Sequence, residues 1–270
     1  MLRAVLFDLG DTLWQMPIPI ERGHLHTLVA RAVTRTLDGH GLPAGWDAVC
    51  FAADLHTAME AALESAHHGN LAAPDGPAIL ERVASRHGLT LDPDLRDALW
   101  QAAFIHPDSL GRQVYPDAAE TLAWLRGHGY AVGVVSNRWF GGPLLAAELQ
   151  SAGLAAYVTA AVCSCDCGWL KPHPEIFARA LAALDVPAGD ALLVGDSPLA
   201  DLQPAAMLGM RTCWKRNGSR LHPLPPGLHP DHRIDDLREI RWLPYFFARR
   251  EAGALPAASA VPDETAEERR

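Results

Sequence analysis

Lysine is almost absent from this chain of 270 residues, since Lys171 and Lys215 are its only two lysines. Acidic residues outnumber basic ones, and the formal net charge is −9. Proteins that bind nucleic acids carry basic patches or stripes, and this sequence contains none. We therefore expect no nucleic-acid partner, and a lysine that stands beside a motif becomes informative.

Long hydrophobic runs are absent as well. No apolar stretch approaches the roughly 20 residues that a helix needs to cross a bilayer, and the first residues lack the pattern of a secretory signal. The five cysteines are an odd set without the spacing of a disulfide framework. These absences predict a protein of the reducing cytoplasm with no membrane partner.

What the sequence does contain is the composition of a globular protein, with 49% hydrophobic and 20% charged residues. From Asp117, which we place as a helix N-cap, helical patterns alternate with short apolar runs. The predicted strands lie at residues 130–135, 157–163, 191–194, 211–214 and 233–234. This alternation predicts an α/β fold with a doubly wound, Rossmann-like parallel sheet and helices on both of its faces.

An all-helical block interrupts this pattern. Periodic apolar residues predict helices at 20–37, 46–65, 78–87 and 94–105, with a loop at 67–77. We therefore predict a discontinuous α/β core of residues 1–16 and 112–250, with a helical cap of residues 17–111 inserted after the first strand. The small, polar and acidic residues 251–270 predict a disordered tail.

The first apolar run, Ala4–Phe7, ends on Asp8, and Thr12 follows four residues later. A buried parallel strand delivers the residue at its carboxyl end into the crevice where ligands bind. A carboxylate in that position is costly unless a metal or a cation meets it. Asp8 is therefore predicted to be a nucleophile or a metal ligand.

Three further features stand at the expected ends of core elements. Ser136 and Asn137 follow a strand, Lys171 precedes a helix that Pro174 can open, and Asp196 and Asp201 follow the strand at 191–194. Each feature recurs by chance in other proteins. Their occurrence together with Asp8, in this order and on these elements, predicts one active site.

On these motifs the chain resembles the haloacid dehalogenase-like (HAD) hydrolase superfamily, over roughly residues 3–240 with the cap included. The resemblance implies that Asp8 attacks phosphorus and forms an aspartyl-phosphate. It implies that Thr12, Ser136 and the backbone amide of Asn137 bind the phosphoryl oxygens, and that Lys171 neutralises the nucleophile and the phosphate. An anionic nucleophile needs such charge cancellation around a phosphate ester.

The same resemblance implies Mg²⁺ as the cofactor. Asp8, the backbone carbonyl of Gly10 and Asp196 would bind the ion, and Asp201 would brace the metal site or Lys171. A few carboxylates, a carbonyl and several waters are the ligands that Mg²⁺ prefers.

One position departs from the family pattern. HAD phosphatases usually carry a second aspartate two residues after the nucleophile, as the general acid that protonates the leaving alcohol. That position is Gly10 here, and Asp11 follows it. General acids typically contribute about 10²–10⁴-fold. Either Asp11 substitutes, or the enzyme is slow or prefers good leaving groups such as acyl phosphates and aryl esters.

Three functions follow from these features. The first is a Mg²⁺-dependent phosphatase of a small phosphorylated metabolite, because a cap over the crevice excludes large substrates. The second is a 2-haloacid dehalogenase, whose relatives also lack the second aspartate but have no use for Asp196 and Asp201. The third is a catalytically weak HAD-fold binding protein. The cap contains no lysine, which argues against phosphonatase chemistry.

Some other residues invite a functional interpretation. The one-residue spacing of Cys163, Cys165 and Cys167 places them on one face of an extended segment, which favours simple thiols over a zinc site. His67 and His68 are predicted to lie in a solvated loop. Near the expected mouth of the site stand Trp14, Arg22 and Arg138, and Ser197, next to Asp196, could touch the phosphate or the waters of the metal.

Overall fold

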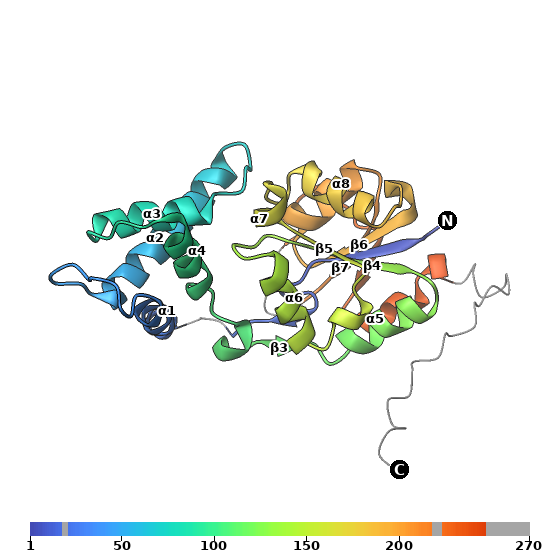
Figure 1. Cartoon of the computed structure of the whole chain (residues 1–270). Coiled ribbons are helices and arrows are strands. Elements are labelled where there is room, and N and C mark those ends of the chain that lie inside the picture. The colour runs from blue at the N-terminus through green and yellow to red at the C-terminus, as the bar shows by residue number, and fades with distance from the viewer. Residues whose placement is uncertain (18–20, 218–222, 247–270) are drawn as a thin grey trace, which may run out of the picture.

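The computed structural model describes residues 1–17, 21–217 and 223–246. Its centre is a sheet of six strands in the order β5-β4-β1-β6-β7-β8, and all neighbouring strands run parallel (Figure 1). The strands are β1 (Ala4–Phe7), β4 (Ala131–Ser136), β5 (Ala160–Cys163), β6 (Ala191–Gly195), β7 (Arg211–Lys215) and β8 (His232–Ile234). The predicted parallel α/β sheet is confirmed.

Helices cover both faces of this sheet, as the alternation of strands and helices predicts (Figure 1). On one face, α5 (Ala118–Gly127), α6 (Gly142–Ser151) and the short helix η6 (Leu237–Trp242) pack in one hydrophobic cluster with Val5 and Phe7. On the other face, α8 (Pro174–Ala183) and α9 (Gln203–Met207) pack with Ala4 and Leu6. Alternate residues of β1 thus serve the two faces, which is why the strand is apolar throughout.

Four α-helices that follow β1 and precede α5 form a separate unit, which we call the helical insert. They are α1 (Arg22–Thr36), α2 (Ala48–His68), α3 (Gly76–Arg86) and α4 (Pro93–Ala102). They share their own hydrophobic cluster, centred on fully buried residues such as Val33, Phe51, Leu80 and Leu99. Aspartate caps start three of them, because Asp47, Asp75 and Asp92 each accept a backbone N–H from the first turn.

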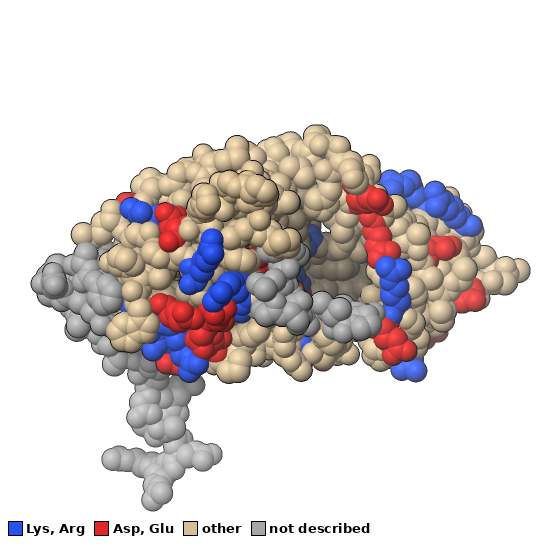
Figure 2. Space-filling model, turned by 180° about the vertical axis from the view of Figure 1, so that it is seen from behind, with Lys and Arg blue, Asp and Glu red and all other residues tan. Residues whose placement is uncertain are grey.

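A two-stranded ribbon joins the helical insert to the sheet domain. Strand β2 (Trp14–Gln15) pairs antiparallel with β3 (Gln113–Val114), so the chain leaves and re-enters the core at the same place. Seen from behind, the molecule is hollowed between the two parts (Figure 2). Among the described residues, no helix has both the length and the apolar character needed to cross a membrane.

Local expectations fail at three places. His67 and His68 form the last turn of α2, where each ring bonds a backbone carbonyl four residues earlier, so the expected loop begins later. Asp117 stands at the start of α5, but its carboxylate accepts the backbone N–H of Leu237 at 2.6 Å instead of capping its own helix. The predicted tail, 251–270, lies outside the described residues.

The cysteine segment is the third such place. Cys163 ends β5, and the chain then coils into the helical turn α7 (Ser164–Cys167). The expected extended segment with three thiols on one face is therefore wrong, because the strand stops at the first cysteine.

Candidate active site

The sheet brings the predicted strand ends to one edge. Strand β1 lies between β4 and β6, with Phe7 opposite Val134 and Val194. Asp8 therefore emerges between Ser136, at the end of β4, and Asp196, just after β6. The backbone N–H of Asp8 still donates to the carbonyl of Val194 at 3.0 Å, which fixes the position of its side chain.

Lys171 stands at the centre of this edge. Its Nζ lies 2.6 Å from Oδ1 of Asp8 and 2.7 Å from Oδ1 of Asp201. All three side chains are almost excluded from solvent. Burial pulls the pKa of Lys171 down, but the Asp201 and Asp8 carboxylates outweigh it, and the pKa ends above its usual value. Lys171 is therefore a permanent cation between two carboxylates.

A wide helical turn, Pro198–Leu202, places Asp201. A Cβ atom at Gly195 would lie 2.5 Å from Oδ2 of Asp201, so only glycine lets that carboxylate approach the strand end. Oδ2 accepts the backbone N–H of Ser197 at 3.1 Å, while the Ser197 hydroxyl accepts the N–H of Ala200 at 3.2 Å. The hydroxyl of Ser197 thus caps the turn.

The carboxylates of Asp8, Asp196 and Asp201 lie within 4.8 Å of one another. Burial, followed by the charges of Asp8 and Asp201, raises the pKa of Asp196 to about 8. Burial also raises the pKa of Asp8 to about 6, with Lys171 opposing and Asp201 adding to the rise. One lysine does not balance three buried carboxylates, so this donor set fits a divalent cation that prefers oxygen ligands.

The hydroxyl residues that are expected to bind phosphate are Thr12, which follows β1, and Ser136, which ends β4. Thr12 is fully buried, and its hydroxyl makes no hydrogen bond within the described residues. A buried hydroxyl without a partner costs about 1–3 kcal/mol, and a phosphoryl oxygen would satisfy it. Ser136 is also buried. These hydroxyls fit the expected place of a phosphoryl group.

The side chain of Asn137 has a role that the sequence did not predict. Its Oδ1 accepts the backbone N–H of Lys171 at 2.7 Å, and its Nδ2 donates to the Lys171 carbonyl at 3.1 Å. This two-point contact holds Lys171 across 34 residues of sequence. The predicted role rested on the backbone amide alone, since only the folded register brings these two loops together.

Lys215 is a second residue near this edge whose burial and contacts the sequence did not predict. It ends β7, next to β6, and is 2% exposed. Its Nζ lies 3.7 Å from the ring centre of Tyr115 and 2.9 Å from Oδ1 of Asn217. Burial lowers its pKa, while the carboxylates of Asp117, Asp196 and Asp11 oppose the shift. The scarcity of lysine was the only available clue.

The structure also defines the surroundings of Gly10. A Cβ atom there would meet no described atom within 4 Å, and the backbone does not require glycine. Asp11 has a left-handed backbone with φ of 56°, and its N–H donates to the Trp14 carbonyl at 2.6 Å. The charge of Asp11 acts on Asp196 and Lys215. Whether Asp11 serves as the acid stays a prediction.

The residues expected near the mouth have partners within the protein. Trp14 is buried in the core, and the guanidinium of Arg112 lies 4.8 Å from its ring centre. Arg22 pairs with Glu60 at 2.9 Å. The guanidinium of Arg138 forms an ion pair with the fully buried Glu148. Arg138 also lines a cavity of about 450 Å³ that begins beside Asn137.

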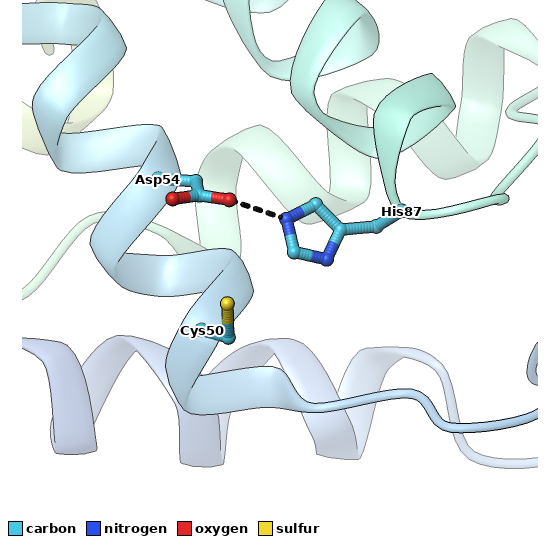
Figure 3. A group of neighbouring side chains, drawn as sticks. All are labelled: Cys50, Asp54 and His87. Carbon is cyan, nitrogen blue, oxygen red and sulfur yellow. Dashed lines mark hydrogen bonds and ion pairs between the residues drawn. The ribbon is translucent and has the colours of Figure 1, made fainter.

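Within the described part of the chain, two other groups of side chains have the spacing of metal ligands. Cys163 and Cys165 lie with their Sγ atoms 3.4 Å apart, and Asp166 completes that group. In the helical insert, Cys50 and Asp54 of α2 lie near His87, whose ring bonds Asp54 at 2.8 Å (Figure 3). This second group is mostly exposed, and its histidine and aspartate already satisfy each other.

This chain belongs to the haloacid dehalogenase-like hydrolase family, whose model matches residues 2–209. It is therefore an enzyme of the hydrolase class. The parallel sheet and the site at its carboxyl edge agree with that assignment.

Among relatives, a phosphoserine phosphatase of Thermus thermophilus is 32% identical over 252 residues, which cover 88% of this chain and 98% of that protein. A ribulose-1,5-bisphosphate 5-phosphatase of Halopiger xanaduensis is 30% identical, over 78% of this chain and 84% of that protein. A solved 2-haloacid dehalogenase of Pseudomonas syringae pv. Tomato is 26% identical with a TM-score of 0.61, and covers 93% of this chain and all of that one.

Proposed function

We propose that the protein is a Mg²⁺-dependent phosphatase that hydrolyses a small phosphorylated metabolite through an aspartyl-phosphate on Asp8. The observation that favours this function is the group of three buried carboxylates around Lys171, which has more negative charge than the lysine neutralises. Relatives named as phosphatases of phosphoserine and of ribulose-1,5-bisphosphate support the same reaction class.

The reaction has two steps. An oxygen of Asp8 attacks phosphorus, the bond from phosphorus to the ester oxygen breaks, and the leaving group departs with the electron pair and gains a proton. Water then attacks the aspartyl-phosphate, which releases inorganic phosphate and restores Asp8. The nucleophile is anionic in the first step, so Lys171, 2.6 Å away, offsets its repulsion for the phosphate.

The hydroxyls of Thr12 and Ser136, with the backbone amide of Asn137, would bind the phosphoryl oxygens. Donors that are already oriented stabilise the charge that develops there without reorganising. Asp8, Asp196 and the carbonyl of Gly10 would hold Mg²⁺, which supplies positive charge next to the phosphoryl group. Asp201 would anchor Lys171 and limit the freedom of the metal site. The helical insert would act as the cap that keeps bulk water and large substrates out.

The dehalogenase alternative has one specific observation in its favour. The solved haloacid dehalogenase named above has the same fold. Gly10 occupies the position of the second aspartate of HAD phosphatases, and dehalogenases are expected to lack that aspartate. Against this alternative stands Asp196, whose pKa is raised by burial and then by the carboxylates of Asp8 and Asp201 beside it. A metal-free reaction has no use for that crowding.

A panel assay tests the proposal. Release of phosphate from phenyl phosphate, acetyl phosphate, phosphoserine and phosphoglycolate is measured with Mg²⁺ and with EDTA, beside chloride release from 2-chloropropionate. We expect Mg²⁺-dependent phosphate release that Asp8→Asn abolishes, while the exposed Asp94→Asn on α4 keeps the wild-type rate. Chloride release in EDTA would instead establish the dehalogenase. Phosphate binding without any turnover would establish the binding protein.

A further inference from the structure

The cavity beside Asn137 lies between the helical insert and the core. Helices α1 and α2, residues 103–110 and residues 137–140 form its wall, and its volume is about 450 Å³. Asn137 both lines this cavity and holds the backbone of Lys171. The cavity therefore begins at Asn137, whose backbone amide is proposed to bind the phosphoryl group. Its volume is in the range of pockets that take small organic ligands.

Most of the cavity wall is apolar. Helices α1 and α2 supply aliphatic side chains, including Leu25, Val29 and Leu63. Residues 103–110 and 137–140 supply aromatic rings, including Phe104, Trp139 and Phe140. The Phe104 and Phe140 rings lie edge to face, with their centres 5.3 Å apart. Such a wall favours an apolar, ring-shaped ligand, because burying apolar area is favourable by about 25 cal/mol per Å².

The polar side chains of the wall pair with groups of the protein. A ring nitrogen of His26 lies 2.9 Å from one of His56, Glu60 pairs with Arg22, and Arg138 pairs with Glu148. A hydroxyl-rich ligand would give up its hydrogen bonds to water, and to replace them it would have to compete with the pair of Arg138 with the fully buried Glu148 and with the His26–His56 contact. Burying a polar group without compensation is costly. The wall therefore disfavours sugar phosphates.

The second, independent feature is Gly10. Without an acid two residues after Asp8, the ester oxygen must leave with little help. A phenol has a pKa of about 10, like the tyrosine side chain, and its anion is therefore a far better leaving group than an alkoxide. Gly10 and the cavity thus favour the same kind of ester.

We propose that the substrate is an aryl phosphate, with its phosphoryl group at Asp8 and Thr12 and its ring in the cavity of the helical insert. This inference rests on the phosphatase function proposed above. The phosphorus–oxygen bond breaks as Asp8 attacks, the phenolate leaves with the electron pair, and solvent supplies its proton. Inorganic phosphate and the free phenol are the products.

Three esters separate the two features on the wild-type protein. Ethyl and benzyl phosphate both release alcohols, so their ratio measures the ring contact, while phenyl against benzyl phosphate measures the leaving group. At saturating Mg²⁺ we expect benzyl phosphate to exceed ethyl phosphate in kcat/KM by at least about 10-fold, since each buried methylene contributes about 4-fold. We expect phenyl phosphate to exceed benzyl phosphate by about 100-fold.

A pair of variants on α2 tests whether the ring of the ester contacts the cavity wall. Leu63 lines the cavity without packing in the cluster of the helical insert, and Val49 is half exposed outside the cavity. Leu63→Gln should lower kcat/KM about 5- to 10-fold for benzyl phosphate and less for ethyl phosphate, whereas Val49→Gln should change neither.

The outcomes are distinguishable. If ethyl phosphate or phosphoserine is hydrolysed as well as benzyl phosphate, the aryl inference is wrong and the phosphatase function stands. If none of the esters releases phosphate, the phosphatase function is wrong and the inference falls with it. The ester series decides even if Leu63→Gln does not fold.

Discussion

The proposed active site has two ends, the sheet edge around Lys171 and the cavity of the helical insert, and the two ends differ in charge. At the sheet edge, Asp8, Asp196 and Asp201 crowd around Lys171 with almost no access to water. In the cavity of the helical insert, the charged groups pair with one another and apolar side chains form most of the wall. The first end has an excess of negative charge that calls for cations, and the second end is neutral.

This difference matches the origin of the two ends. Asp8 and Asp196 directly follow strands whose positions are fixed by parallel pairing, and Asp201 lies in the helical turn that follows β6. The cavity wall belongs largely to helices that pack in a cluster of their own. The sheet therefore holds the carboxylates proposed to perform the chemistry, and the cavity wall proposed to select the substrate can change without disturbing them.

Removing the charge of Lys171 from the sheet edge should have the largest effect on activity. Lys171→Met leaves Asp8 and Asp201 buried without their partner, so we expect at least a ~10³-fold loss of kcat. Breaking a buried pair also destabilises a fold by about 3–5 kcal/mol. Phosphate release and urea unfolding measure both effects. The control is Lys215→Met, the only other lysine, with an expected loss below about 10-fold; equal losses would contradict the role of Lys171.

Gly10→Asp should reduce the difference in kcat between esters with good and with poor leaving groups. A Cβ atom at this position meets no described atom within 4 Å, so the backbone site accepts a side chain. We expect a gain of about 10- to 100-fold for benzyl phosphate and little change for phenyl phosphate, because only the poor leaving group needs a proton. The kcat values of both esters provide the measurement. An equal change for both would show that the new carboxyl does not act as an acid.

The crowded carboxylates should also destabilise the metal-free protein at high pH. The folded-state pKa of Asp196 is about 8, above its unfolded value near 4, so the folded state binds the proton more tightly. Stability from this group is full below pH 4 and is lost as pH rises to about 8. In EDTA at pH 8.5, Asp196→Asn should therefore be more stable than the wild type by thermal unfolding. A matched change, Asp94→Asn, should not stabilise.

The smallest effect should come from the neutral end. Burial lowers the pKa of His56, with His26 and Arg22 adding to the shift and Glu60 opposing it. The unfolded chain then binds the proton more tightly, so stability is full above pH 6.5 and is lost as pH falls below that value. Urea unfolding at pH 7.5 and at pH 5.5 measures this effect. Between these two pH values, the free energy of unfolding should fall less for His56→Gln than for the wild type. An identical loss in both proteins would assign the effect to other groups.

Much of the fold could be predicted because each buried strand of a parallel sheet is a short apolar run, and polar residues directly after such runs gather at one edge. That reasoning predicted the positions of Asp8, Ser136 and Asp196. It did not predict that the side chain of Asn137 holds Lys171, since this contact depends on how two loops meet in space. The cysteine segment was misjudged because an alternating pattern does not reveal where a strand ends.

The burial of both lysines has a practical consequence. Lys171 is 4% and Lys215 is 2% exposed, and the sequence contains no other lysine. The basic surface in Figure 2 is therefore almost entirely arginine. The side-chain amines of both lysines are thus shielded in the folded protein, so reagents that acylate lysine should modify the native protein slowly and the unfolded protein fast. The rate of lysine acylation would therefore report how often the sheet edge around Lys171 opens to solvent.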